Sequence, residues 1–188
     1  MLFVIYRVNL LAEVRHIEET AELLYQQQEV EAAIEQMAEK INLLLSDRNP
    51  ILLTVLNGGI VTAGKLLTQL NFPLVLDAIH VSRYQNKTQG GSIEWLLKPD
   101  TPMQNRTVLI VDDILDEGLT LEAIYQYCQA QGAASIYSAV LIDKQLDQAK
   151  PVQADFVGLQ VENRYIFGYG LDYKGYLRNA PGIYICKE

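Results

Sequence analysis

Three carboxylates, Asp112, Asp113 and Asp116, lie within five positions and are followed by Gly118 and Thr120. Like charges at this spacing repel one another, and proteins that keep them together usually use them on a cation or a hydroxyl-rich ligand. A glycine lets a ligand approach the backbone closely, and the amides that open a following helix can bind an anion. Carboxylates for hydroxyls beside amides for a phosphate indicate a site for a phosphorylated sugar.

Two other interpretations of this segment remain open. Acidic residues after a strand are often only solvated, or they cap the next helix at the positive end of its dipole. The letters D-D-I-L-D at residues 112–116 also fit the D-D-x-x-D motif with which helical prenyl-transfer enzymes bind Mg²⁺ and a diphosphate. The β-branched run before the motif and the glycine after it disfavour a helix, so we favour the sugar-phosphate site.

The apolar run at residues 108–111 predicts the buried strand that positions this acidic segment. Ligands of parallel α/β sheets bind at the carboxyl ends of the strands, which is where these carboxylates fall. The surrounding chain alternates between strands and helices, which predicts a mostly parallel sheet with helices on both faces. The expected strands are residues 51–56, 75–81, 93–97, 107–111 and 136–142, and the expected helices are residues 60–70 and 121–131.

The two ends of the chain have a different pattern. Residues 9–24 and 28–46 are predicted to be helices, because apolar residues in the second segment recur at helical spacing opposite glutamates. Beyond Pro151 the pattern changes to short strands and turns, which suggests a cap over the edge of the sheet. The short strands are expected at residues 156–161, 165–167 and 183–186.

Size and charge limit the class of protein. A chain of 188 residues with 49% apolar residues suits one α/β domain over residues 1–188, with a core of about residues 50–150 and a cap from residues 1–48 and 151–188. The net charge of −8 disfavours nucleic acid as a partner. No apolar stretch is long enough to cross a bilayer and the N-terminus lacks the basic start of a secretory signal, so we expect a cytoplasmic protein without a membrane partner.

The strand followed by an acidic pair, a glycine and a threonine resembles the diphosphoribosyl-binding motif of the type I phosphoribosyltransferases. Further segments in the family's order, at residues 56–59, 82–91, 141–144 and 161–178, narrow the resemblance to the bacterial hypoxanthine-guanine phosphoribosyltransferases. It implies the type I phosphoribosyltransferase fold, with a central, mostly parallel sheet flanked by helices and a small cap, or hood, in a homodimer or homotetramer. It also implies purine salvage: Mg²⁺-dependent transfer of the phosphoribosyl group of 5-phosphoribosyl 1-diphosphate (PRPP) to N9 of hypoxanthine or guanine, giving IMP or GMP and pyrophosphate.

The resemblance assigns roles to residues of the PRPP site. Asp116 would be the catalytic group, which exchanges a proton at N7 of the purine as the base attacks C1′. Asp112 and Asp113 would bind the ribose hydroxyls and lie at the Mg²⁺, and Asp172 would be a further metal ligand. The other residues expected to bind PRPP are Leu56, Asn57, Gly58, Glu117, Gly118, Leu119, Thr120 and Arg178.

Three residues are expected to bind the purine. Lys144 would donate to the 6-oxo group, which favours hypoxanthine and guanine over adenine. Tyr165 would stack on the purine ring, and Ile166 would offer main-chain groups to its edge. These roles disfavour adenine as the substrate, while the lack of a side-chain donor at position 166 disfavours xanthine.

A flexible loop that contains Ser82, Arg83 and Tyr84 would close over the bound substrates and exclude water from the reacting ribose. The chain departs from the family's usual pattern in this loop, where Arg83 stands in place of a serine. It departs again in the phosphate-binding segment, where Glu117 replaces a hydroxyl residue and Leu119 a polar one. These changes leave open a regulator with this fold that binds nucleotide and RNA, although the net charge of −8 opposes it.

Overall fold

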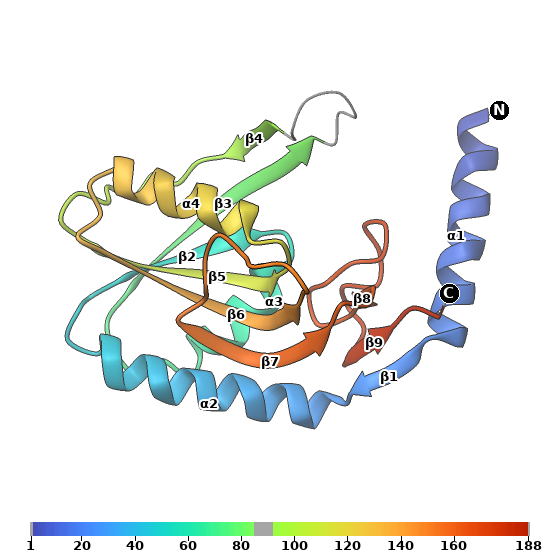
Figure 1. Cartoon of the computed structure of the whole chain (residues 1–188), viewed down its shortest axis with the longest axis horizontal. Helices are drawn as coiled ribbons and strands as arrows, with labels where there is room; N and C mark the ends of the chain where they lie inside the picture. The colour runs from blue at the N-terminus through green and yellow to red at the C-terminus, as the bar shows by residue number, and fades with distance from the viewer. Residues whose placement is uncertain (1, 85–91, 188) are drawn as a thin grey trace.

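A six-stranded sheet forms the centre of the fold in the computed structural model, which describes residues 2–84 and 92–187 (Figure 1). Its strand order is β4-β3-β2-β5-β6-β7, with β4 antiparallel to β3 and the other neighbours parallel. The strands are β2 (Ile51–Leu56), β3 (Val75–Tyr84), β4 (Ser92–Leu97), β5 (Thr107–Leu115), β6 (Ser135–Gln145) and β7 (Phe156–Glu162).

Helices cover both faces of this sheet. α2 (Gln27–Leu45) and α3 (Gly59–Leu67) pack on one face, and α4 (Leu119–Ala130) packs on the other. Alternate strand residues supply the two cores, since Leu52 packs toward α2 and α3 while its neighbour Ile51 packs toward α4. The predicted mostly parallel sheet with helices on both faces is therefore confirmed.

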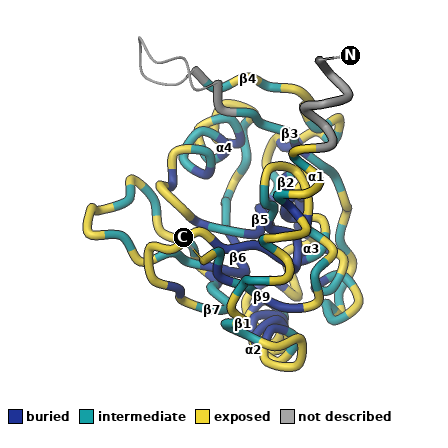
Figure 2. The backbone as a smooth tube through the Cα atoms, turned by 90° about the vertical axis from the view of Figure 1, so that its right-hand side faces the viewer, coloured by how far each residue is buried: buried dark blue, intermediate teal, exposed yellow. Residues whose placement is uncertain are grey.

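The central strand β5 is buried from both sides. It lies between β2 and β6, so its carboxyl end is in the middle of the sheet. Residues 108–111 of β5 have no exposed surface, and Figure 2 shows β5 and β6 as the buried centre of the molecule. Burying one such aliphatic side chain contributes about 1.5–3 kcal/mol to stability. The strand that carries the acidic segment is thus a rigid part of the core.

A second, antiparallel sheet has the order β1-β9-β8 and lies beside the carboxyl ends of the central strands (Figure 1). It is preceded by α1, and Val14 of that helix packs against Phe167 and Leu177. The bounds of these elements are α1 (Leu2–Thr20), β1 (Glu22–Tyr25), β8 (Ile166–Phe167) and β9 (Ile183–Ile185). None of the helices in the described residues is long and apolar enough to cross a membrane.

The structure differs from the predicted elements at several boundaries. Residues 22–24, predicted as the end of a helix, belong with Tyr25 to β1, because β9 offers this segment a strand partner from the other end of the chain. α2 packs against the central sheet and β7 forms its edge strand, so these two parts of the predicted cap belong to the core. The second sheet therefore contains only a part of the predicted cap, namely the strands β1, β8 and β9.

The strand that leads to the predicted flexible loop is longer than expected. β3 continues through Ser82, Arg83 and Tyr84, which pair with residues 92–94 of β4. The expectation that these three residues lie in a loop is wrong, because the returning strand extends the ladder. The remainder of the predicted loop, residues 85–91, lies outside the described residues.

Candidate active site

Asp112 and Asp113 lie on β5 itself and not in the loop after it. The strand continues to Leu115 because β6 pairs with this segment, with Asp112 opposite Val140. Both carboxyl side chains are buried, and Asp112 Oδ1 accepts a hydrogen bond of 2.9 Å from the Asp113 amide. Two acidic groups are therefore held in the core at the point where the apolar part of β5 ends.

Burial changes the protonation of this pair. It raises the pKa of the Asp112 carboxyl well above its ordinary range, and the neighbouring charge of Asp113 acts in the same direction. Burial also raises the pKa of Asp113, while the hydrogen bond with Asp112 and the charge of Arg178 act against it. A pair of this kind favours a ligand that brings hydroxyl donors or a cation.

The turn after β2 packs directly against the acidic pair. It consists of Leu56, Asn57 and Gly58, with a cis peptide bond between the first two, and α3 begins at Gly59. A Cβ atom added to Gly58 would lie 1.9 Å from Oδ2 of Asp113. A side chain at position 58 would thus collide with the Asp113 carboxylate, and the backbone of the turn lies beside the acidic pair. Backbone turns of this kind can bind an anion.

Replacement of Gly58 by alanine is expected to destabilise the protein by about 1–3 kcal/mol, because the new methyl group must displace the Asp113 carboxylate. Gly64→Ala, inside the helix α3 that follows this turn, is the matched control, since a Cβ there meets nothing within 4 Å and alanine favours a helix interior by about 0.5–1 kcal/mol. Chemical denaturation of both variants measures the difference. A Gly58→Ala protein as stable as the control would contradict the tight packing of the turn.

A second backbone turn connects β5 to α4. Gly118 has a φ of +84°, a left-handed conformation that glycine adopts without strain, and it precedes the first residue of α4. Glu117 precedes Gly118 in this turn, and Leu119 and Thr120 are the first two residues of α4. The first N–H groups of a helix have no partner within the helix, so this end of α4 is suited to a phosphate.

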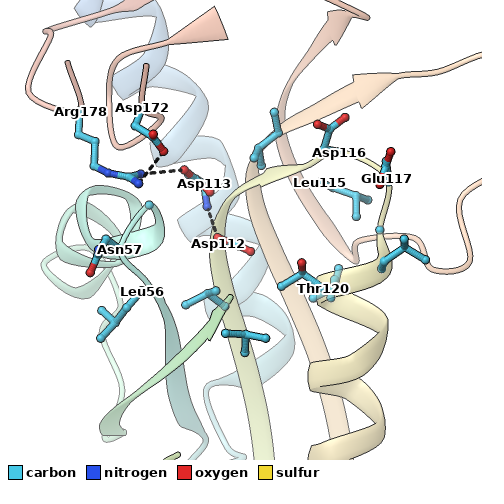
Figure 3. A pocket seen from close by; sticks show the side chains of 17 residues that line it. Leu56, Asn57, Asp112, Asp113, Leu115, Asp116, Glu117, Thr120, Asp172 and Arg178 are labelled. Carbon is cyan, nitrogen blue, oxygen red and sulfur yellow. Dashed lines mark hydrogen bonds and ion pairs between the residues drawn. The ribbon is translucent and has the colours of Figure 1, made fainter. Parts of the chain in front are cut away.

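Arg178 brings the C-terminal segment to the acidic pair (Figure 3). Its Nη2 lies 2.6 Å from Asp172 Oδ1, its Nη1 lies 3.9 Å from Asp113 Oδ2, and Nη1 also donates a hydrogen bond of 2.6 Å to the Gly170 carbonyl. Asp172 Oδ2 in turn accepts a hydrogen bond of 2.6 Å from the Gly175 amide. A cation and a further carboxylate are thus fixed beside Asp113.

These elements enclose a cavity of about 270 Å³. All the residues predicted to bind PRPP line it, together with the predicted catalytic Asp116 and the predicted metal ligand Asp172. Val81 of β3, Ile114 and Leu115 also line it, and no motif pointed to these apolar residues. The predicted PRPP residues in the wall are Leu56, Asn57, Gly58, Asp112, Asp113, Glu117, Gly118, Leu119, Thr120 and Arg178.

A second cavity, of about 180 Å³, adjoins the first. The three predicted purine-binding residues, Lys144, Tyr165 and Ile166, all line it. Asp116 lines both cavities, and its Oδ2 lies 3.1 Å from Lys144 Nζ. The Tyr165 side chain is more than half exposed, so its ring is accessible to a flat ligand. A planar base could therefore lie next to the carboxylate that borders the first cavity.

The donor atoms at the first cavity suit a hard cation. Asp112, Asp113 and Asp172 present carboxylate oxygens, which Mg²⁺ prefers. Within residues 2–84 and 92–187, no three acidic, histidine or cysteine side chains are grouped so that they could hold a metal by themselves. Because Mg²⁺ is commonly bound by one or two carboxylates together with substrate phosphates, the residues fit a metal that binds with a phosphorylated substrate.

A buried carboxylate pair between two backbone turns, at the carboxyl end of a central parallel strand, is typical of an α/β protein that binds a sugar phosphate. Residues 20–174 of the chain match the phosphoribosyl transferase domain. The chain belongs to the phosphoribosyltransferase family, as the acidic motif and its neighbouring segments predicted.

The names of the relatives within this family contain purine bases. The hypoxanthine-guanine-xanthine phosphoribosyltransferase of Tritrichomonas foetus is 34% identical over 179 residues, which cover 95% of this chain and 98% of that protein. The hypoxanthine-guanine phosphoribosyltransferase of Bacillus subtilis is 31% identical over 166 residues, covering 88% and 92%. A solved hypoxanthine phosphoribosyltransferase of Trypanosoma cruzi has a TM-score of 0.82 at 28% identity, covering 88% of this chain and 91% of that one. The predicted type I phosphoribosyltransferase fold is confirmed.

Proposed function

We propose that this protein is a purine-salvage enzyme that transfers the 5-phosphoribosyl group of PRPP to N9 of hypoxanthine or guanine, giving IMP or GMP and pyrophosphate. One observation carries the proposal: two adjoining cavities share Asp113, Asp116 and Asp172. The first has the carboxylates and backbone turns that a ribose with two phosphate ends requires, and the second has a lysine and an exposed aromatic ring for a 6-oxopurine. The names of the relatives support the same reaction.

The first cavity would bind PRPP along its length. Asp112 and Asp113 would accept hydrogen bonds from the ribose hydroxyls, because they are buried at the middle of the cavity wall. The amides at the start of α4 would bind the 5′-phosphate, and the turn at residues 56–58 would bind the pyrophosphate at the other end. Arg178 lies on that second side and would contribute a positive charge to the pyrophosphate.

The second cavity would hold the purine with its N7 edge toward Asp116. Lys144 Nζ would donate to the 6-oxo group, and Tyr165 would lie on the ring face. The Lys144 and Asp116 side chains contact each other at 3.1 Å, so a purine that presents N7 and O6 on one edge could meet both. Adenine would place a donor against the lysine ammonium group, which disfavours it.

In the reaction, N9 forms a bond to C1′ while the bond from C1′ to the pyrophosphate oxygen breaks, and the pyrophosphate leaves with the electron pair. Asp116 accepts the proton that the base loses from N7, which is general base catalysis. Arg178 and the amides of residues 56–58 stabilise the negative charge that develops on the leaving pyrophosphate. Asp112 and Asp113 hold the ribose hydroxyls so that C1′ faces the base.

Mg²⁺ is the proposed cofactor of this site. Asp172 and the pair Asp112 and Asp113 would hold it together with oxygens of PRPP, since these are the hard ligands that the cavity wall provides. When bound, the metal would supply positive charge to the pyrophosphate.

We also infer that the enzyme acts in the cytoplasm and that it is a homodimer or homotetramer. The exposed apolar side chains of Ile60 on α3 and Leu76 on β3 lie beside one another, which supports self-association.

The function is tested by mixing the protein with PRPP, Mg²⁺ and one base at a time: hypoxanthine, guanine, xanthine or adenine. Formation of IMP and GMP is expected, with no AMP, and a parallel reaction with a chelator should be inactive. Xanthine is included because the Tritrichomonas foetus relative carries that base in its name. If no base yields a nucleotide although PRPP binds, the protein is not this enzyme and the regulatory alternative is favoured.

A further inference from the structure

Lys150 makes contacts at the site that no motif in the sequence suggested. It lies in the connection between β6 and β7, and only 13% of its side chain is exposed. Its Nζ donates a hydrogen bond of 2.6 Å to the Leu115 carbonyl and lies 2.6 Å from Asp143 Oδ1. A lysine whose ammonium group makes two short contacts in a partly buried place is fixed in position and not a solvated surface charge.

These two contacts lie next to the proposed chemistry. Leu115 immediately precedes Asp116, and Asp143 immediately precedes Lys144. Leu115 and Asp143 are also opposite each other in the parallel pairing of β5 and β6. The ammonium group therefore connects the ends of the two strands at the residues that immediately precede the proposed base and the proposed purine donor.

The start of the Lys150 side chain, at Cβ, has a different neighbour. A Cβ atom added to Gly118 would lie 3.4 Å from Lys150 Cβ and 3.2 Å from Pro151 Cδ, so this segment packs against the turn before α4. That turn lines the end of the first cavity where the 5′-phosphate is proposed to bind. The ammonium group thus serves the purine side of the site, and the start of the side chain supports the phosphate side.

We propose that Lys150 is a positioning residue that fixes Asp116 and Lys144 side by side for the N7 and O6 edge of the purine. The inference rests on the proposed function, because it assigns that edge to these two side chains. A purine must contact both groups at once, so small changes in their separation are costly. Lys150 restrains both from a single atom, through the backbone of one strand and a side chain of the other.

Lys150→Met tests the role of the ammonium group, because methionine keeps an unbranched apolar stem and removes the donors. We expect kcat/KM for hypoxanthine to fall about tenfold to a hundredfold, while KM for PRPP changes far less. Lys150→Ala also removes the ammonium group but keeps the Cβ beside Gly118, so it should show the same pattern, with KM for PRPP changed little. Lys40→Met, at an exposed position of α2, is the matched control and should behave as the unchanged protein.

A double-mutant cycle identifies the contact. Asp143→Asn weakens the same bridge from its other end, so combining it with Lys150→Met should cost much less than the sum of the two single effects. Additive losses, an unchanged Lys150→Met enzyme, or equal losses toward PRPP and hypoxanthine would overturn the inference. If Lys150→Met does not fold, the single Asp143→Asn variant carries the same kinetic comparison. Absence of turnover in the unchanged protein would instead refute the proposed function.

Discussion

Asp116→Asn is expected to lower kcat for IMP formation by about 10²–10⁴-fold while KM for PRPP stays nearly unchanged. An amide has the shape of the carboxylate and cannot accept the proton that the purine loses from N7. Asp116 lines both cavities, so its side chain borders the purine site as well as the PRPP site. Loss of proton transfer should therefore separate from loss of binding.

The structure also indicates that this substitution leaves the fold intact. About half of the Asp116 side chain is exposed, and it accepts a hydrogen bond of 3.1 Å from Lys144 Nζ, which an amide oxygen can still accept. Asp147→Asn is a suitable control, because it removes the same charge from an exposed position in the connection after β6. Steady-state kinetics in both substrates and calorimetric titration with PRPP provide the readouts. Equal losses in kcat and in PRPP affinity would make Asp116 a structural residue.

The positions of these groups could be predicted from the sequence to the extent that strand ends determine them. The β-branched run at residues 108–111 identified the central strand, and parallel strands place their carboxyl ends at one edge of a sheet. Asn57 and Asp116 follow β2 and β5, and Lys144 lies near the end of β6, so the proximity of these three residues follows from the α/β pattern. The boundary of β5 could not be predicted, because acidic residues are typical of loops and only pairing with β6 keeps them in the strand.

The individual contacts between distant parts of the chain could not be predicted from residue spacing. The Arg178 side chain reaches Asp172 and Asp113 because the C-terminal segment folds back over β5, and spacing along the chain does not specify this. Lys150 lies in a connection of ordinary polar composition, and its contacts depend on how that connection returns across the ends of β5 and β6. The pattern of residues 22–24 predicts the end of a helix, and they form a strand because β9 is available as a partner.

The site also bears on stability, because Asp112→Asn is expected to make the ligand-free protein more stable while it loses affinity for PRPP. The substitution removes one of two neighbouring buried charges and keeps an oxygen that can accept the 2.9 Å hydrogen bond from the Asp113 amide. Each unit by which burial raises a carboxyl pKa corresponds to about 1.4 kcal/mol of cost for the charged form. A gain of ~1 kcal/mol raises the Tm of a chain of this size by roughly 2–4 °C.

The raised pKa of Asp112 gives this difference a definite pH dependence. The native protein holds the proton of the Asp112 carboxyl more tightly than the unfolded chain does. The stability that this protonation contributes is therefore complete below the ordinary pKa of 3.8 and is lost as pH rises through the native pKa. Glu31 behaves in the opposite way: its hydrogen bond from Lys65 lowers its pKa to about 2, and its contribution is lost as pH falls toward that value. Because asparagine does not titrate, the Tm advantage of Asp112→Asn should be smallest in acid and increase toward alkaline pH.

Thermal unfolding of Asp112→Asn, of Asp147→Asn and of the unchanged protein across this pH range measures the effect, and a second series with PRPP and Mg²⁺ measures its functional counterpart. A ligand that binds only the native state stabilises it, so PRPP with Mg²⁺ should raise the Tm of the unchanged protein and have little effect on Asp112→Asn. A variant less stable than the unchanged protein at neutral pH would mean that the buried charge is already compensated without a ligand. We expect the unchanged protein to be less stable than Asp112→Asn without a ligand and to gain more stability from PRPP and Mg²⁺. Both differences follow because the unchanged protein keeps two carboxylates in its core for ribose and metal to bind.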